Sequence, residues 1–436
     1  MKIFIQTLGC EKNTVDSENA AALLENAGCT IVQDPSEADC FIVNTCGFIG
    51  DAKKQSIETI FDLSREKTEG KKLIVTGCLS QRYGKELAEE MPEVDAFLGV
   101  NDYSRLADVV LGLSSERTYC SAASSVYEEL GSRKLSTAPW TRSIKIAEGC
   151  SNICSYCAIP FIRGRYRSRR EEDILKEAQQ LAKEGCKELI IIAQDVTFYG
   201  RDLGITDALP QLLKKLCRIE GLHWIRLMYC YEDEISDALI DTIRSEEKIC
   251  KYLDIPLQHC VDHVLKDMNR KSTAKSIEYT VEKLRKHIPN ITIRTTLISG
   301  FPKETKEDAS ALMSFVERTR FERLGVFAYS KEEGTKAADL PGQVRKDVKE
   351  RRRDHIMELQ RGISLENNRK LIGKTLEVLV EEQDSEDTYI GRSYMDAPEI
   401  DNSVIFTSRR ALSPGSFVNV KITDAFDYDI SGEAVY

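Results

Sequence analysis

The sequence has no long apolar run and no export signal. Although 42% of its 436 residues are hydrophobic, none of its apolar segments approaches the roughly 18 residues that a membrane span requires. The N-terminal stretch MKIFIQTLGCEKN begins with one lysine and a short strand-like run, which reaches polar residues too soon for a signal peptide. We therefore expect a cytoplasmic protein with no membrane contact.

The chain also lacks an excess of basic charge. Its 61 lysines and arginines face 71 acidic residues, a net charge of -10 with neutral histidines, which disfavours binding of nucleic acid through charge alone. Fourteen cysteines without an export signal argue against a disulfide framework, because cytosolic thiols stay reduced. Metal binding is the better explanation for so many cysteines.

The length exceeds what one hydrophobic core usually supports and suggests about three folding units. Short apolar runs alternate with amphipathic stretches from the N-terminus to about Gly112, which predicts a parallel-sheet α/β domain over residues 1–113. Residues 114–137 are rich in Ser, Glu and Thr and are expected to form a linker.

A second βα series occupies residues 138–368. Six candidate strands separated by helix-length segments predict a partial (β/α) barrel; they are 143–147, 188–193, 223–228, 252–255, 291–298 and 324–328. In residues 369–436, five short runs separated by turn residues predict a small five-stranded antiparallel β-barrel of the oligonucleotide-binding kind. The expected fold class is therefore α/β with a small barrel at the C-terminal end.

Three cysteines follow the first strand of the central domain in a C-x3-C-x2-C run, Cys150, Cys154 and Cys157. Three thiolates from one loop suit an iron-sulfur cluster and leave one metal position open for catalysis. A closed zinc site needs a fourth protein ligand, and the nearest histidine is the distant His223. None of the five histidines has metal-ligand spacing.

A second set of cysteines lies at the ends of predicted strands in the first domain. Cys10, Cys46 and Cys78 each follow such a strand, and ligands of open parallel sheets bind beyond the carboxyl ends of the strands. The three thiols are therefore expected to converge at one edge. Six other cysteines are expected to be small buried hydrophobes, namely Cys29, Cys40, Cys186, Cys217, Cys230 and Cys250.

Over its whole length the sequence resembles the methylthiotransferase family of radical S-adenosylmethionine enzymes. The likeness rests on LGCEKNTVDSE (8–18), IVNTCGF (42–48), VTGCLSQRYG (75–84) and EGCSNICSYCAIPFIRGRYRSR (148–169), and the last domain resembles the small barrel called TRAM. Glu11 stands where proline is usual, and Lys303 stands where glycine is usual. Neither departure removes a predicted ligand.

This resemblance implies two 4Fe-4S clusters. Cys150, Cys154 and Cys157 would hold the cluster that binds S-adenosylmethionine as radical source, and the first-domain triad would hold an auxiliary cluster that carries the sulfur. A second S-adenosylmethionine would donate the methyl group. An external reductant, such as a flavodoxin or ferredoxin, and an external sulfur source would be required.

Six further residues are predicted cofactor contacts, each with ordinary packing or barrel hydrogen bonding as the alternative. Tyr156 lies beside Cys157, and the other five lie on or at the ends of predicted strands, where barrels build catalytic faces. These five are Gln194, Asp195, Asp254, Gln258 and Arg294.

The substrate implied by the resemblance is either small-subunit ribosomal protein S12 or a transfer RNA. From Leu371 to Tyr436 there are 5 basic and 13 acidic residues, a poor platform for RNA and a suitable dock for a basic protein. FAYSKEEGTKAADLP (327–341) and GRSYMDAPEID (391–401) also resemble the ribosomal-protein branch. The expected product is 3-methylthioaspartate in that protein, free or on the small subunit.

Two alternatives stay open from the sequence. One is methylthiolation of the tRNA adenosine beside the anticodon, through the same chemistry. The other is a non-enzymatic iron-sulfur carrier, which would hold both clusters without cleaving S-adenosylmethionine.

Overall fold

The computed structural model describes residues 1–436, which form two compact units. The first unit comprises Met1–Thr137, Lys145–Arg169 and Ser330–Ala338, and the second unit comprises Ala138–Ile144, Arg170–Tyr329 and Asp339–Tyr436. The loop with Cys150, Cys154 and Cys157 thus belongs to the same unit as Cys10, Cys46 and Cys78. The domain boundaries expected from the sequence stay predictions.

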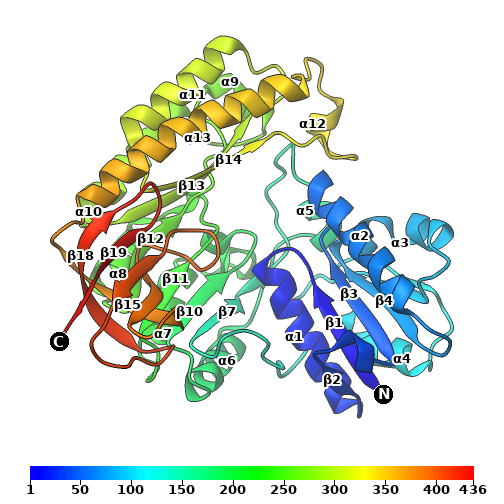
Figure 1. The fold of residues 1–436 in the computed structure, drawn as a ribbon. Coiled ribbons are helices and arrows are strands. Elements are labelled where there is room, and N and C mark those ends of the chain that lie inside the picture. Colours follow the sequence, from blue (N-terminus) through cyan, green and yellow to red (C-terminus); the bar gives the residue numbers. More distant parts are fainter. The chain divides into compact units, whose positions relative to one another are not determined.

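The first unit contains a six-stranded, fully parallel sheet, as predicted (Figure 1). Its spatial order is β2-β1-β3-β4-β5-β6. The strands are β1 (Lys2–Thr7), β2 (Thr30–Val32), β3 (Cys40–Thr45), β4 (Lys72–Gly77), β5 (Ala96–Leu98) and β6 (Thr118–Tyr119). The edge strand β6 comes from the segment expected to be a linker.

Four helices cover the two faces of this sheet. They are α1 (Glu11–Asn26), α2 (Gly50–Glu66), α3 (Cys78–Glu90) and α4 (Leu106–Leu111). Leu24 of α1 and Val110 of α4 share one core with Ile42 of β3, whereas Ile60 of α2 and Leu79 of α3 share another with the opposite face. Because both faces are covered, every residue of β3 is buried.

Two paired strands and a short helix flank the cysteine loop in the first unit. Strands β8 (Ala147–Glu148) and β9 (Arg167–Ser168) pair in antiparallel fashion, and α5 (Ile159–Arg163) lies between them in the sequence. The cysteine loop therefore runs from β8 to α5, within the segment that joins the two paired strands.

The second unit contains the predicted six-stranded central sheet, in the order β14-β13-β12-β11-β10-β7. Successive strands from β10 to β14 pair in parallel, and the sheet is open, which confirms a partial barrel. The strands are β7 (Thr141–Lys145), β10 (Glu188–Ile192), β11 (Trp224–Leu227), β12 (Ile249–Asp254), β13 (Thr292–Ser299) and β14 (Arg323–Ala328).

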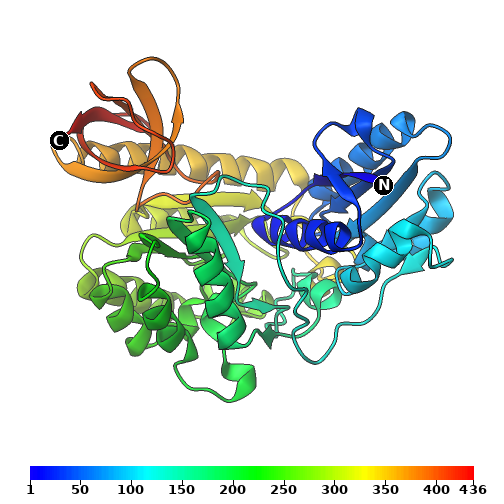
Figure 2. The same ribbon diagram turned by 90° about the horizontal axis from the view of Figure 1, so that it is seen from below.

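The helices of the central region follow the βα alternation of the sequence (Figure 2). They are α6 (Glu171–Lys183), α7 (Ala208–Cys217), α8 (Asp237–Ser245), α9 (Asp262–Asp267), α10 (Ala274–His287), α11 (Lys306–Thr319) and α13 (Lys346–Arg369). The short helix α12 (Lys336–Asp339) has its first three residues in the first unit. The long helix α13 packs against β13, β14 and α11. None of the helices combines the length and apolar character needed to cross a membrane.

The C-terminal residues form a closed five-stranded barrel in the order β15-β16-β17-β19-β18. Its strands are β15 (Thr375–Gln383), β16 (Thr388–Ser393), β17 (Val404–Thr407), β18 (Phe417–Ala425) and β19 (Ile430–Val435). The expectation of a purely antiparallel barrel was wrong, because β17 and β19 pair in parallel. Directions cannot alternate around a closed ring with an odd number of strands, so at least one neighbouring pair must be parallel.

Buried ion pairs join this barrel to the central sheet within the second unit. Glu188, at the start of β10, accepts hydrogen bonds from Arg226 of β11 at 2.8 Å and from Arg392 of β16 at 2.6 Å. The Arg226 guanidinium also donates to the carbonyl oxygen of Tyr394 at 2.8 Å. We call Glu188, Arg226 and Arg392 the barrel anchor.

Candidate iron-sulfur site

The first-domain cysteines lie at one edge of the first sheet, as predicted. Cys10 follows β1, Cys46 follows β3, and Cys78 follows β4 as the first residue of α3. Because the three strands are parallel neighbours, their carboxyl ends meet at this edge. In the order β2-β1-β3-β4, the chain places β2 on one side of β1 and the following strands on the other side. Open α/β sheets bind their ligands at such a topological switch point.

The loops carrying these cysteines touch one another through glycine. A Cβ atom placed on Gly9 would lie 2.9 Å from the Cβ atom of Cys46, and a Cβ atom on Gly47 would lie 2.8 Å from the backbone nitrogen of Leu79, the residue after Cys78. Both distances are too short for any larger residue. The glycines beside Cys10 and Cys46 therefore let the three loops converge.

Buried polar side chains fix these loops in place. The Nδ2 atom of Asn13 donates to the carbonyl oxygens of Leu8 at 2.7 Å and Thr45 at 3.1 Å, and so ties the loop after β1 to the loop after β3. The Ser56 hydroxyl makes 3.1 Å hydrogen bonds with the backbone nitrogen and oxygen of Cys46. Sequence reasoning did not single out either residue.

Burial changes the acidity of two thiols at this edge. It raises the pKa of Cys46, and it raises the pKa of Cys78 to about 11, although the nearby Arg163 guanidinium acts in the opposite direction. Without a metal these thiols are protonated at neutral pH. Binding a metal therefore requires release of their protons, as is usual for thiolate sites.

The second cysteine triad lies in the loop between β8 and α5. Cys150 and Cys154 are buried, and Cys157 is half-buried. Burial first, and then the neighbouring Cys154 and Cys150, raise the pKa of Cys157. The backbone nitrogen of Cys157 donates to the carbonyl oxygen of Cys154 at 3.1 Å, which folds the loop into a turn.

A close backbone contact ties the start of the loop to the residues that follow α5. The backbone nitrogen of Cys150 donates to the Gly164 carbonyl oxygen at 3.1 Å, and a Cβ atom on Gly149 would overlap the Arg165 carbonyl oxygen. The positive φ of 78° at Gly149 also suits glycine. Tyr156 lies half-buried within this loop, and its predicted cofactor contact stays a prediction.

Within the first unit, one cysteine of the first triad packs against the segment that follows the second triad. Cys78 packs in one small apolar cluster with Ala158 and Ile162. Ala158 directly follows Cys157, and Ile162 belongs to α5. Helix α3 begins at Cys78, helix α5 begins two residues after Cys157, and the two helices are in contact. The structure thus brings together two loops that are far apart in the sequence.

The chemistry of the donor set suits iron-sulfur clusters. Such clusters are held by cysteine thiolates, and three thiolates on a 4Fe-4S cluster leave one iron open. Two sets of three cysteines, each from loops held by tight backbone contacts, fit two such clusters.

The remaining predicted contacts lie in the second unit. Asp195 caps a short 3-10 helix by accepting from Thr197 Oγ1 at 2.6 Å and from the Phe198 backbone nitrogen at 3.2 Å. Gln194 precedes it and is half-buried. Gln258 has a positive φ of 70° and bridges to Leu297 through its backbone.

Asp254 and Arg294 lie opposite each other on β12 and β13 and form an ion pair of 2.9 Å. Arg294 also pairs with Asp401 of the C-terminal barrel region at 3.3 Å. These contacts account for the charge of Arg294 within the protein. Roles of these five second-unit residues toward a cofactor stay predictions.

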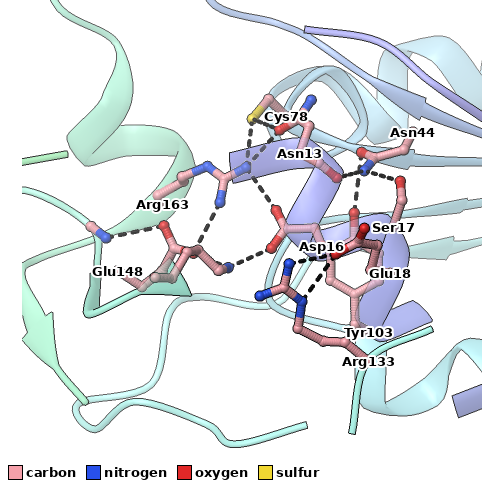
Figure 3. Close-up of polar contacts among 12 residues, drawn as sticks. Asn13, Asp16, Ser17, Glu18, Asn44, Cys78, Tyr103, Arg133, Glu148 and Arg163 are labelled. Carbon is pink, nitrogen blue, oxygen red and sulfur yellow. Dashed lines mark hydrogen bonds and ion pairs between the residues drawn. The ribbon is translucent and has the colours of Figure 1, made fainter. Parts of the chain in front are cut away.

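One buried arginine beside the first triad was missed in the sequence. Arg163, the last residue of α5, donates to the Sγ atom of Cys78 at 3.4 Å and also to Asn13, Asp16 and Glu148 (Figure 3). Five arginines occur between residues 163 and 170, and nothing in the sequence separates this one from the others.

Three family models match the chain. The uncharacterized protein family UPF0004 matches residues 2–99, the radical SAM superfamily matches residues 144–316, and the TRAM domain matches residues 372–435. The order of the three matches is the order of the first sheet, the central sheet and the barrel.

Curated relatives match over almost the full length. A protein of Thermoanaerobacter sp. (strain X514), "Ribosomal protein uS12 methylthiotransferase RimO", is 50% identical over 98% of this chain and 99% of its own length. A protein of Clostridium acetobutylicum with the same name is 48% identical over 99% of this chain and 98% of its own length.

Two solved structures share the fold at low identity. The radical S-adenosylmethionine methyltransferase TsrM from Kitasatospora setae has a TM-score of 0.57 at 14% identity and covers 74% of this chain and 72% of its own. The cobalamin-dependent S-adenosylmethionine radical enzyme OxsB has a TM-score of 0.54 at 12% identity, covering 77% and 54%. At these identities the likeness concerns the fold alone.

Proposed function

This chain belongs to the RimO family of methylthiotransferases, and from that membership we propose that it methylthiolates an aspartate of ribosomal protein uS12. A C–H bond at the β-carbon is replaced by C–S–CH3, which gives 3-methylthioaspartate. Full-length identity near 50% to proteins of that name is the observation that carries the proposal.

Two triads of cysteines divide the cofactors between them in this proposal. Cys150, Cys154 and Cys157 hold the 4Fe-4S cluster that binds S-adenosylmethionine, and Cys10, Cys46 and Cys78 hold the auxiliary 4Fe-4S cluster. When bound, these groups supply the radical that removes the hydrogen atom and the sulfur and methyl group that are transferred. Each triad supplies three ligands, which leaves one iron open to S-adenosylmethionine or sulfur.

The protein side chains bind and shield these groups. Cys78, Cys150 and Cys154 are buried, which keeps water from three of the six ligand sulfurs, whereas Cys10 is exposed. The close contacts of Gly9 and Gly47 fix the spacing of the first triad. The electrons and the replacement sulfur come from outside the chain. A small redox protein such as a flavodoxin or ferredoxin is the expected donor.

The C-terminal barrel supports a protein substrate over RNA. Asp384, Glu386 and Asp387 lie in its exposed turn between β15 and β16, and Glu382 is exposed near the end of β15. Of its five basic residues, Arg392 is buried in the barrel anchor and cannot contact a phosphate. An acidic surface attracts a basic ribosomal protein and repels a nucleic acid backbone. A ribosomal substrate also implies action in the cytoplasm.

An anaerobic assay tests the function directly. Reduced, reconstituted enzyme is incubated with S-adenosylmethionine, sulfide and either uS12 or an anticodon-loop RNA, and the products are read by mass spectrometry. We expect a gain of about 46 Da, SCH3 replacing H, on an aspartate of uS12 and none on the RNA. Modification of RNA alone would establish the tRNA alternative.

A control separates the enzyme from a passive cluster carrier. The triple variant Cys150→Ala, Cys154→Ala, Cys157→Ala is expected to give no 5'-deoxyadenosine and no product. If the unmodified enzyme also releases no 5'-deoxyadenosine under reducing conditions, the chain is a carrier and the proposed activity is wrong.

A further inference from the structure

Arg163 is a fully buried cation at the junction of the two cysteine triads. Its side chain is 2% exposed. It ends the helix that follows Cys157, yet its guanidinium points toward the edge of the first sheet (Figure 3). A buried guanidinium requires partners for its donors.

Its partners come from three separate segments. From α1 the guanidinium reaches Asn13 Oδ1 at 2.8 Å and Asp16 Oδ2 at 2.9 Å, and from β8 it reaches Glu148 Oε2 at 3.0 Å. From the start of α3 it reaches the Sγ atom of Cys78 at 3.4 Å. One side chain therefore links a predicted auxiliary ligand to the strand that leads into the other cysteine loop.

The carboxylates in this group do not depend on Arg163 alone. Lys145 Nζ also pairs with Asp16 Oδ1 at 2.5 Å and with Glu148 Oε2 at 2.9 Å. Two cations and two carboxylates are already balanced before the thiol is counted. The contact with Cys78 is therefore beyond what charge pairing among these four groups requires.

We propose that Arg163 is a positioning residue for the auxiliary cluster, through a hydrogen bond to the sulfur of Cys78. This inference rests on the proposed function, because it takes Cys78 as a cluster ligand. Hydrogen bonds and positive charge at ligand sulfurs stabilise the more negative, reduced state of a cluster and so raise its reduction potential. The same side chain fixes Cys78 relative to Glu148, two residues before Cys150.

The planar guanidinium suits this role better than an ammonium group. It donates in several fixed directions at once, whereas lysine presents a compact charge on a flexible stem. Arg163→Lys keeps the charge and loses the geometry, and Arg163→Gln loses both. Because Lys145 keeps Asp16 and Glu148 paired, neither variant leaves these carboxylates without a cation.

The test measures a reduction potential. All proteins carry Cys150→Ala, Cys154→Ala and Cys157→Ala, so that only the auxiliary cluster is loaded, and reduction is followed by electron paramagnetic resonance. Arg165→Gln is the matched control, because Arg165 is exposed and lies in the same motif. Iron content and circular dichroism establish that each protein is loaded and folded.

We expect a lower midpoint potential for Arg163→Gln, a smaller decrease for Arg163→Lys, and no shift for Arg165→Gln. Equal potentials for the parent and both Arg163 variants would overturn the proposal. If Arg163→Gln takes up no cluster, Arg163→Lys decides: a potential equal to that of the parent would overturn the proposal, and a lower one would support it. A parent protein without iron would instead refute the assignment of Cys10, Cys46 and Cys78, a failure of the proposed function.

Discussion

Two of the buried charge groups in this protein, one from each unit, differ in what their arginines contact. In the barrel anchor, Arg226 and Arg392 contact the carboxylate of Glu188 and backbone carbonyl oxygens. In the first unit, Arg163 contacts carboxylates and also a cysteine sulfur. Burial of charge is common to both, so burial alone does not mark a functional site.

From this difference we expect the barrel anchor to contribute to stability and the Arg163 group to contribute to cofactor chemistry. The barrel anchor joins two parts of the second unit that lie about 200 residues apart, with Glu188 and Arg392 separated by 204 positions. The guanidinium donors of its two arginines bind carboxylate and carbonyl oxygens of the protein itself. A sulfur is a weak acceptor as a thiol and a strong one as a metal-bound thiolate. If Cys78 ligates a cluster as proposed, the contact with Arg163 would strengthen when that cluster is bound.

Loss of the first triad should give the largest change in activity. We expect Cys10→Ala, Cys46→Ala and Cys78→Ala together to stop methylthiolation completely and to spare cleavage of S-adenosylmethionine, because the other triad is intact. Product and 5'-deoxyadenosine are measured in parallel by mass spectrometry. Loss of all iron in this variant would show that the two cluster sites are not independent.

Loss of the barrel anchor should give the largest change in stability. Replacing Glu188 by Gln leaves Arg226 and Arg392 without their shared anion in a buried site, and breaking a buried pair costs about 3 to 5 kcal/mol. Chemical denaturation of the apo protein measures the free energy of unfolding. The comparison between the two groups would fail if the same change shifted the potential of the auxiliary cluster.

Much of the fold could be predicted from the sequence because local pattern determines it. The alternation of apolar runs and amphipathic stretches identified both parallel sheets, and the position of Cys10, Cys46 and Cys78 after strands identified one shared edge. Parallel strands force their carboxyl ends together, so this convergence needs no knowledge of side-chain packing. The parallel pair β17 and β19 follows from closure of the barrel, which a list of strands does not reveal.

The buried charges could not be predicted because their partners lie far away in the sequence. Arg163 is one of several arginines in FIRGRYRSR, and its burial depends on Asn13 and Asp16, about 150 positions earlier. Likewise Arg294 was predicted as a cofactor contact from its place on a strand, and its pairing with Asp401 is visible only in the folded barrel. Tertiary contacts of this kind leave no local signal.

The pH dependence of stability should sharpen the contrast at the barrel anchor. Burial acts to raise the pKa of Glu188, but the guanidinium groups of Arg392 and Arg226 outweigh it and lower the pKa from 4.5 to about 2. A lowered pKa stabilises the fold above the ordinary value, and this contribution is lost as the pH falls from 4.5 toward 2. It amounts to on the order of 3 kcal/mol.

Denaturation of the apo protein across this pH range checks the contribution. The free energy of unfolding should fall more steeply in the unmodified protein than in Glu188→Gln, since glutamine does not titrate. Parallel curves for the two proteins would show that Glu188 has the same pKa in the folded and unfolded states. The arginines of the barrel anchor would then not lower the pKa of Glu188.

Exposed ion pairs should give the smallest effect and set the baseline for both buried groups. Asp62 and Arg65 pair at 2.9 Å on α2, with side chains that are 70% and 76% exposed. Water and salt screen such a pair, which contributes about 0.5 kcal/mol or less. We expect Asp62→Asn to leave both the free energy of unfolding and the cluster potential unchanged within error. A loss comparable to that of Glu188→Gln would mean that geometry alone, without burial, accounts for the strength of the barrel anchor.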